Sequence, residues 1–108
     1  MAYNEGVADR IRSVLALRTD TREQKMFGGI AFMIGGNMAV GVMGDELLVR
    51  AGKEDGARFL AQSDVRTMEM GGRSSTGWLL IGGQRLEDEF ELWVDRGVSY
   101  AQSLPAKK

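Results

Sequence analysis

The chain has 108 residues and a formal net charge of −1, and it contains neither cysteine nor histidine. Disulfides, thiolate catalysis and cysteine-ligated metals are therefore excluded, and so is the histidine chemistry that most general bases and many metal sites use. The near-zero charge argues against direct nucleic-acid binding, because neutralised phosphates supply most of that affinity. We expect one cytoplasmic domain over 1–108 with no cofactor and no metal; no apolar run reaches the ~20 residues of a membrane helix.

The first predicted element is a helix over about residues 5–17. Asn4 can accept backbone N–H bonds as an N-cap, and apolar residues follow at helical spacing, namely Val7, Ile11, Val14 and Leu15. A polar run over 18–24 then reads as a connection to the next element.

Residues 25–44 combine glycine, methionine and apolar residues, a mixture that disfavours a helix and favours short strands with tight turns. Gly35-Gly36-Asn37 and Gly44-Asp45 are hairpin signals, because these residue types tolerate positive φ. We predict an antiparallel meander with strands near 25–28, 30–34, 38–43 and 46–51.

The second half of the chain predicts alternating helices and strands. The pattern predicts a helix over residues 53–62. It also predicts two further strands over residues 66–70 and 78–81, separated by the glycine–serine loop 71–75. The last helix keeps one apolar stripe from Leu86 to Leu104 and ends before Pro105. The predicted fold is therefore α+β and two-layered, with an antiparallel sheet of about five to six strands and N-terminal, middle and C-terminal helices.

Side chains alternate between the two faces of a strand, and here both sets are apolar. Ile30, Phe32 and Ile34 share one face of their strand, whereas Ala31 and Met33 share the other. Three helices can cover one face of the sheet and part of the second. We therefore predict a homodimer or protein-partner interface that uses sheet residues such as Phe32, Met33 and Met43.

Several sequence motifs match a known family. The chain contains MFGG followed by IAFMIGGNMAVGVMGDELLVR, with ADRIRSVLA before it and GRSSTGWLLI and LWVDRGVSYAQSLP after it. Together these segments resemble the N-terminal domain of the TfoX (Sxy) family of bacterial competence regulators. The resemblance implies an α+β domain with a secretion-chaperone-like arrangement that is often dimeric. It also implies structural roles for the motif residues Met26, Phe27, Gly28, Gly29 and Asn37.

Full-length members of that family are linked to DNA-uptake competence and act on transcription with other regulators. They carry a second, C-terminal domain, whereas this sequence ends at Lys108 without one. The resemblance therefore implies a stand-alone N-terminal domain.

Basic residues suggest further binding sites. Lys25, Arg50 and Arg73 lie beside predicted strands and would form an anion site if they converged. The plainer interpretation is that they are solvated charges at the sheet edge. Of the three, Arg73 is the best ligand contact, because it lies in a glycine–serine loop. An alternative function is direct nucleic-acid binding through the basic residues of the middle of the chain, namely Arg50, Lys53, Arg58, Arg66 and Arg73.

Catalytic interpretations are weaker. Ser74, Ser75 and Thr76 have no histidine to activate them. The carboxylates at 87–89 and 91 suit a helix start better than a metal site, because consecutive helical residues point in different directions. An enzyme that uses only carboxylates, arginine, lysine or tyrosine is the least favoured alternative. The sequence predicts a non-catalytic interaction and dimerisation module that regulates transcription through a partner, with Phe32, Met33, Met43, Arg50 and Arg73 as candidate interaction residues.

Overall fold

The computed structural model describes residues 3–26, 28–70 and 73–105, without the side chains of residues 26, 68–70 and 73–76. These residues form six strands and four helices. In chain order they are α1 (Glu5–Val14), β1 (Thr21–Met26), β2 (Gly29–Ile34), β3 (Asn37–Met43), β4 (Glu46–Arg50), α2 (Lys53–Phe59), β5 (Val65–Met70), β6 (Arg73–Ile81), α3 (Gly83–Asp88) and α4 (Phe90–Ser103). None of the helices within this part of the chain is long and apolar enough to cross a membrane.

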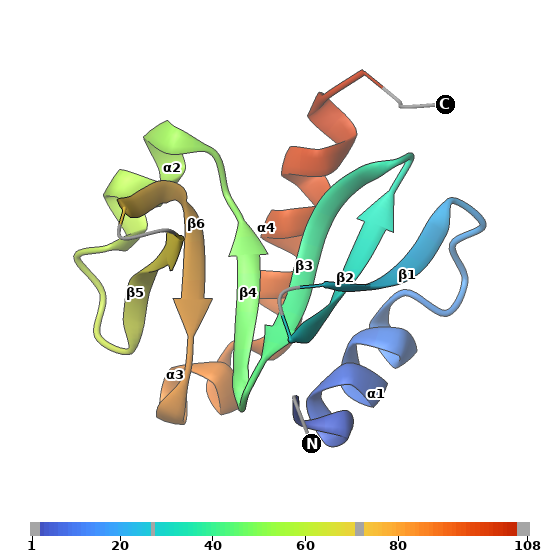
Figure 1. The fold of residues 1–108 in the computed structure, drawn as a ribbon, viewed down its shortest axis with the longest axis horizontal. Helices are drawn as coiled ribbons and strands as arrows, with labels where there is room; N and C mark the ends of the chain where they lie inside the picture. The colour runs from blue at the N-terminus through green and yellow to red at the C-terminus, as the bar shows by residue number, and fades with distance from the viewer. Residues whose placement is uncertain (1–2, 27, 71–72, 106–108) are drawn as a thin grey trace.

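The six strands form one antiparallel sheet in the order β1-β2-β3-β4-β6-β5 (Figure 1). The first four strands make the predicted meander. Gly35, Gly36 and Gly44 adopt φ values of 58°, 84° and 60° at its turns, where glycine has no steric penalty. The chain then passes through α2 and forms the β5–β6 hairpin, which adds β6 beside β4 and leaves β5 at the edge.

The helices pack against one face of this sheet, and α4 lies behind β3 and β4 in Figure 1. The main core joins Ile30, Phe32 and Ile34 of β2 to the inward side chains of α1, α2, α3 and α4. Trp93 of α4 is fully buried there, and its ring meets Phe59 of α2 edge to face, with ring centroids 5.2 Å apart. The predicted α+β architecture with helices layered on an antiparallel sheet is confirmed.

Several predicted boundaries were wrong. Helix α1 ends at Val14 and not near 17, and α2 ends at Phe59 and not at 62. Strand β1 begins at Thr21, inside the run expected to be a connection, because an edge strand with exposed side chains accommodates a polar sequence. Strand β6 begins at Arg73 and not near 78. The single C-terminal helix is divided into α3 and α4 at Glu89, whose φ of −126° and ψ of 27° leave the helical region.

One glycine inside a strand relieves a close approach between neighbouring strands. Gly41 pairs with Ala31 on the face without helices. A Cβ at Gly41 would lie 2.6 Å from the carbonyl oxygen of Ile30. The lack of a side chain at Gly41 therefore lets β2 and β3 pair without a clash.

Helix α4 approaches the sheet closely at Gly97. A Cβ at Gly97 would collide with the carbonyl oxygen of Ala39 and lie 2.5 Å from Cγ1 of Val40. Because the obstacle includes backbone of β3, the helix itself would have to move to admit a side chain.

We expect Gly97→Ala to destabilise the protein by about 1–3 kcal/mol through overpacking, although alanine is a better helix former than glycine by ~1 kcal/mol. Urea denaturation measures the change, and Gln102→Ala, on the exposed side of α4, is the control that should stay near wild type. A Gly97→Ala variant as stable as the control would show that α4 is not held tightly against β3.

An ion pair fastens α1 to the edge strand β1. Arg12 Nε donates to Glu23 Oε2 and Nη2 donates to Oε1, both at 2.9 Å. These charge-assisted hydrogen bonds lower the pKa of the Glu23 carboxyl. Because the folded-state pKa lies below the unfolded value of about 4.3, this stabilisation is complete above that value and is lost as the pH falls through the folded-state pKa.

Glu23→Gln should therefore lower the free energy of unfolding by about 0.5–1 kcal/mol at about pH 7, an amount limited by solvent screening of a partly exposed pair. The difference from wild type should shrink on acidification to about pH 2.5, as the pH falls toward the lowered pKa of Glu23 and protonation removes its charge. Urea denaturation at both pH values checks this, with Glu54→Gln as an exposed carboxylate outside any ion pair of the described residues. A deficit that does not change with pH would rule out the ion pair as its cause.

Candidate interaction face

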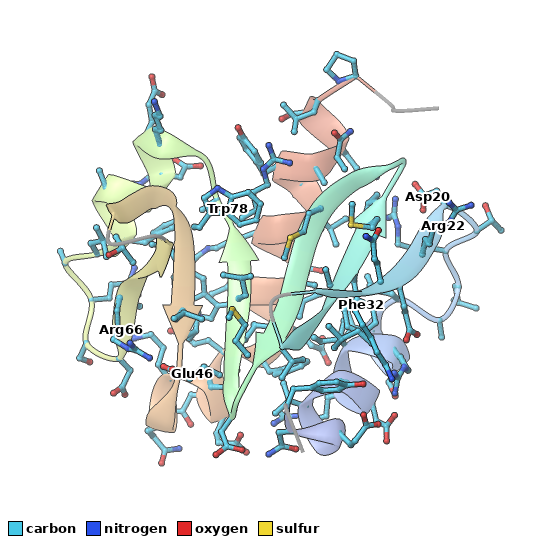
Figure 2. All side chains as sticks on the ribbon, in the orientation of Figure 1. Asp20, Arg22, Phe32, Glu46, Arg66 and Trp78 are labelled. Atoms are coloured by element: carbon cyan, nitrogen blue, oxygen red, sulfur yellow. The ribbon has the colours of Figure 1, made fainter. Side chains whose placement is uncertain are left out.

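A second apolar cluster lies on the face of the sheet that carries no helix. Its buried members are Ala31, Met38, Leu48 and Leu80, and Met33, Met43 and Trp78 pack against them. We call these seven residues the open face. Figure 2 shows Trp78 on this face, in front of the strands and on the side opposite the helices.

The side chains of the open face shield one another. Met33, Met43 and Trp78 are partly exposed and cover four side chains that are buried within the single chain. The face therefore exposes less apolar area than an uncovered sheet would. Methionine suits such a surface because its flexible thioether adapts to irregular partners.

The structure divides the predicted interaction residues between the two faces. Met33 and Met43 belong to the open face, but Phe32 is only 1% exposed and packs in the core beneath the helices. Alternation along β2 requires this, since Phe32 and Met33 are neighbours on one strand. The prediction that Phe32 is an interaction residue was wrong, because its side chain is buried beneath the helices.

Arg50 stands at one end of the open face. Its guanidinium carbon lies 5.0 Å from the centroid of the Trp78 ring and 5.5 Å from that of Tyr100, which comes from α4. Cation–π contacts of this kind fix the position of the side chain, and no carboxylate of the described residues pairs with it. Tyr100 was missed by sequence reasoning, since its position in α4 does not reveal a contact with the end of β4.

The basic residues proposed for nucleic-acid binding do not form one surface. Arg66 pairs with Glu46 at the opposite end of β4, which Figure 2 shows at the lower left. Arg58 pairs with Asp55 on α2. The side chain of Arg73 lies outside the described residues, so neither its role nor a convergence with Lys25 and Arg50 is tested.

The predicted carboxylate cluster is engaged in local contacts. Glu87 pairs with Arg10 at 2.9 Å, and Glu89 accepts hydrogen bonds from Trp93 Nε1 at 3.0 Å and Arg85 Nη1 at 3.1 Å. These contacts hold the junction between α3 and α4 against α1 and the core.

The family-motif residues that the structure describes have structural positions. Asn37 is 2% exposed, and its Nδ2 donates to the carbonyl oxygen of Pro105 at 2.8 Å. Gly28 has a φ of 74°, and a Cβ at Gly29 would collide with the carbonyl oxygen of Val42. Phe27 and the side chain of Met26 lie outside the described residues.

The sequence model of the TfoX N-terminal domain family matches residues 13–101 of the chain, which include β1 to β6 and most of α4. The chain belongs to the TfoX N-terminal domain family. Membership in the TfoX N-terminal domain family suggests a regulatory domain related to competence or transcription. No curated protein sequence matches the chain.

We expect Asn37→Asp to destabilise this TfoX N-terminal domain by about 1–3 kcal/mol at neutral pH, because a carboxylate would face the Pro105 carbonyl without a proton to donate. Protonation at low pH restores a donor, so the deficit should shrink on acidification. Thermal unfolding over a pH series measures this, and Asn37→Ala, which loses the donor without adding a titratable group, should show a deficit that varies little with pH. Identical pH profiles for the two variants would contradict the proposed role of the amide.

Proposed function

We propose that the chain is a non-catalytic interaction module that associates with a second copy of itself through the open face and contributes to transcriptional or competence regulation through a protein partner. The observation that carries this proposal is the second apolar cluster on the sheet face without helices, with Met33, Met43 and Trp78 as its accessible members. The regulatory part rests on family membership.

The composition of the open face favours a protein contact over a nucleic-acid contact. Methionine and tryptophan are enriched in protein interfaces, and Met33, Met43 and Trp78 offer flexible and rigid apolar surface side by side. Of the basic residues near this face, Arg66 is already neutralised by Glu46, whereas phosphate binding needs several free cations.

A homodimer through this face is favoured because the face is self-complementary in chemistry. An interface with two-fold symmetry brings the same patch of each copy together, so methionine side chains would meet methionine side chains and adjust to one another. The helix side of each copy would then remain available to the protein partner.

Light scattering across a dilution series should give twice the monomer mass of 11.8 kDa for the wild-type chain. Met33→Glu and Met43→Glu should shift the protein to monomer, because a charge buried in an apolar contact is costly. Leu17→Glu is the matched control, since Leu17 is 99% exposed outside the open face and should leave the mass unchanged. Circular dichroism confirms that each variant is folded.

A wild-type chain that stays monomeric at every concentration would remove the homodimer. A dimer that both methionine variants leave intact would place the contact elsewhere. Salt-dependent binding of DNA by the wild-type chain would favour direct nucleic-acid recognition over the proposed protein contact.

A further inference from the structure

A cleft of about 460 Å³ lies between α2 and α4, on the helix side of the sheet and apart from the open face. Its apolar wall comes from Phe59, Leu92 and Tyr100, and its polar lining includes Arg96 and Ser99. A volume of this size falls in the range of small-molecule sites.

Arg96 is held in this cleft by two aromatic rings. Its guanidinium carbon lies 4.2 Å from the ring centroid of Phe59 and 4.4 Å from that of Trp93. Trp93 is itself fixed, because it is fully buried and its Nε1 donates to Glu89. The orientation of the guanidinium is therefore set before any ligand arrives.

The hydrogen-bonding capacity of Arg96 is unused within the described residues. Nη1 is shielded from solvent and has no partner, and neither Nε nor Nη2 donates to any described residue. By contrast, Arg10, Arg12, Arg18, Arg58, Arg66 and Arg85 each pair with a carboxylate. Nε and Nη2 are not among the shielded atoms without a partner, so this edge of the guanidinium is not closed off from solvent, and Arg96 lines the cleft.

The two carboxylates that line the cleft do not supply the missing partner. Asp55 is paired with Arg58 at 2.8 Å. Asp95 precedes Arg96 on α4, and consecutive helical residues point in different directions. Asp95 instead places a negative charge at the cleft, which repels anions in proportion to their charge and so disfavours multiply charged ligands more than a monoanion.

We propose that this cleft binds a monocarboxylate attached to an apolar group, with the Nε–Nη2 edge of Arg96 donating to the carboxylate and the apolar group packing against Phe59, Leu92 and Tyr100. The planar guanidinium edge matches the two oxygens of a carboxylate, which a lysine cannot reproduce. Such a group occurs in small organic acids and at the C-terminus of a protein chain. The proposal is independent of dimerisation through the open face.

The test uses the full chain and 3-phenylpropionate as the probe, with 3-phenylpropanamide as its neutral counterpart. Titration followed by NMR should shift the Arg96 Nε–H signal and the backbone signals of α2 and α4 with the carboxylate and not with the amide. Arg96→Gln should weaken binding by at least about tenfold, which corresponds to the loss of a charge-assisted hydrogen-bond pair.

Arg58→Gln is the matched control, because Arg58 also lies over the Phe59 ring, at 5.2 Å, and the variant removes the same charge. It frees Asp55 but leaves the guanidinium of Arg96 in place, so the affinity should fall only by about twofold to threefold. Arg96→Lys keeps the charge and should still bind at least about fivefold more weakly than wild type, because the two-donor edge is lost. This second variant decides the outcome if Arg96→Gln fails to fold.

Tetrapeptides that end in phenylalanine, with a free or an amidated C-terminus, distinguish the two sources. Binding of 3-phenylpropionate and of the free-ended peptide supports a site open to protein C-termini, whereas binding of 3-phenylpropionate alone supports one restricted to small acids. Equal binding of the carboxylate and the amide would overturn the proposal. So would wild-type affinity in both Arg96 variants, or signal changes confined to Trp78 and the open face.

Discussion

The contact on which the rest of the structure depends is the packing of α4 against β3. Gly97 brings the helix backbone against Ala39, and Trp93 fills the space between the sheet and α2. This close approach fixes the height of α4 above the sheet. That height also sets the positions of Arg96 and Tyr100, which belong to α4, and of Phe59, which contacts α4.

Placing all described helices on one side leaves the other side of the sheet to shield itself. Three partly exposed side chains achieve this, because Met33, Met43 and Trp78 pack against the buried members of the open face. Gly41 and Ala31, paired across β2 and β3, keep the middle of the face low enough for methionine to cover. The face is stable in a single chain and still presents adaptable apolar side chains to a partner.

Much of this arrangement follows from local sequence, and the exceptions share a physical origin. The glycine turns identify the meander, and alternation along β2 separates Phe32 from Met33, but the predicted interaction set of Phe32, Met33 and Met43 mixed residues of the two faces. The start of strand β1 at Thr21 could not be found, because an edge strand needs no apolar side chains. The cleft at Arg96 could not be found either, because it combines residues from α2 and α4 whose proximity arises only from packing.

Tyr100 lies between the α2–α4 cleft and Arg50, at one end of the open face. Its ring lies 5.5 Å from the Arg50 guanidinium, which also stacks on Trp78 of the open face, and the same residue lines the cleft. Gly52, with a φ of 84°, makes room for that ring, since a Cβ there would lie 2.5 Å from Tyr100 Cε1. The Tyr100 ring therefore belongs both to the wall of the cleft and to the pair of rings that holds the Arg50 guanidinium in place.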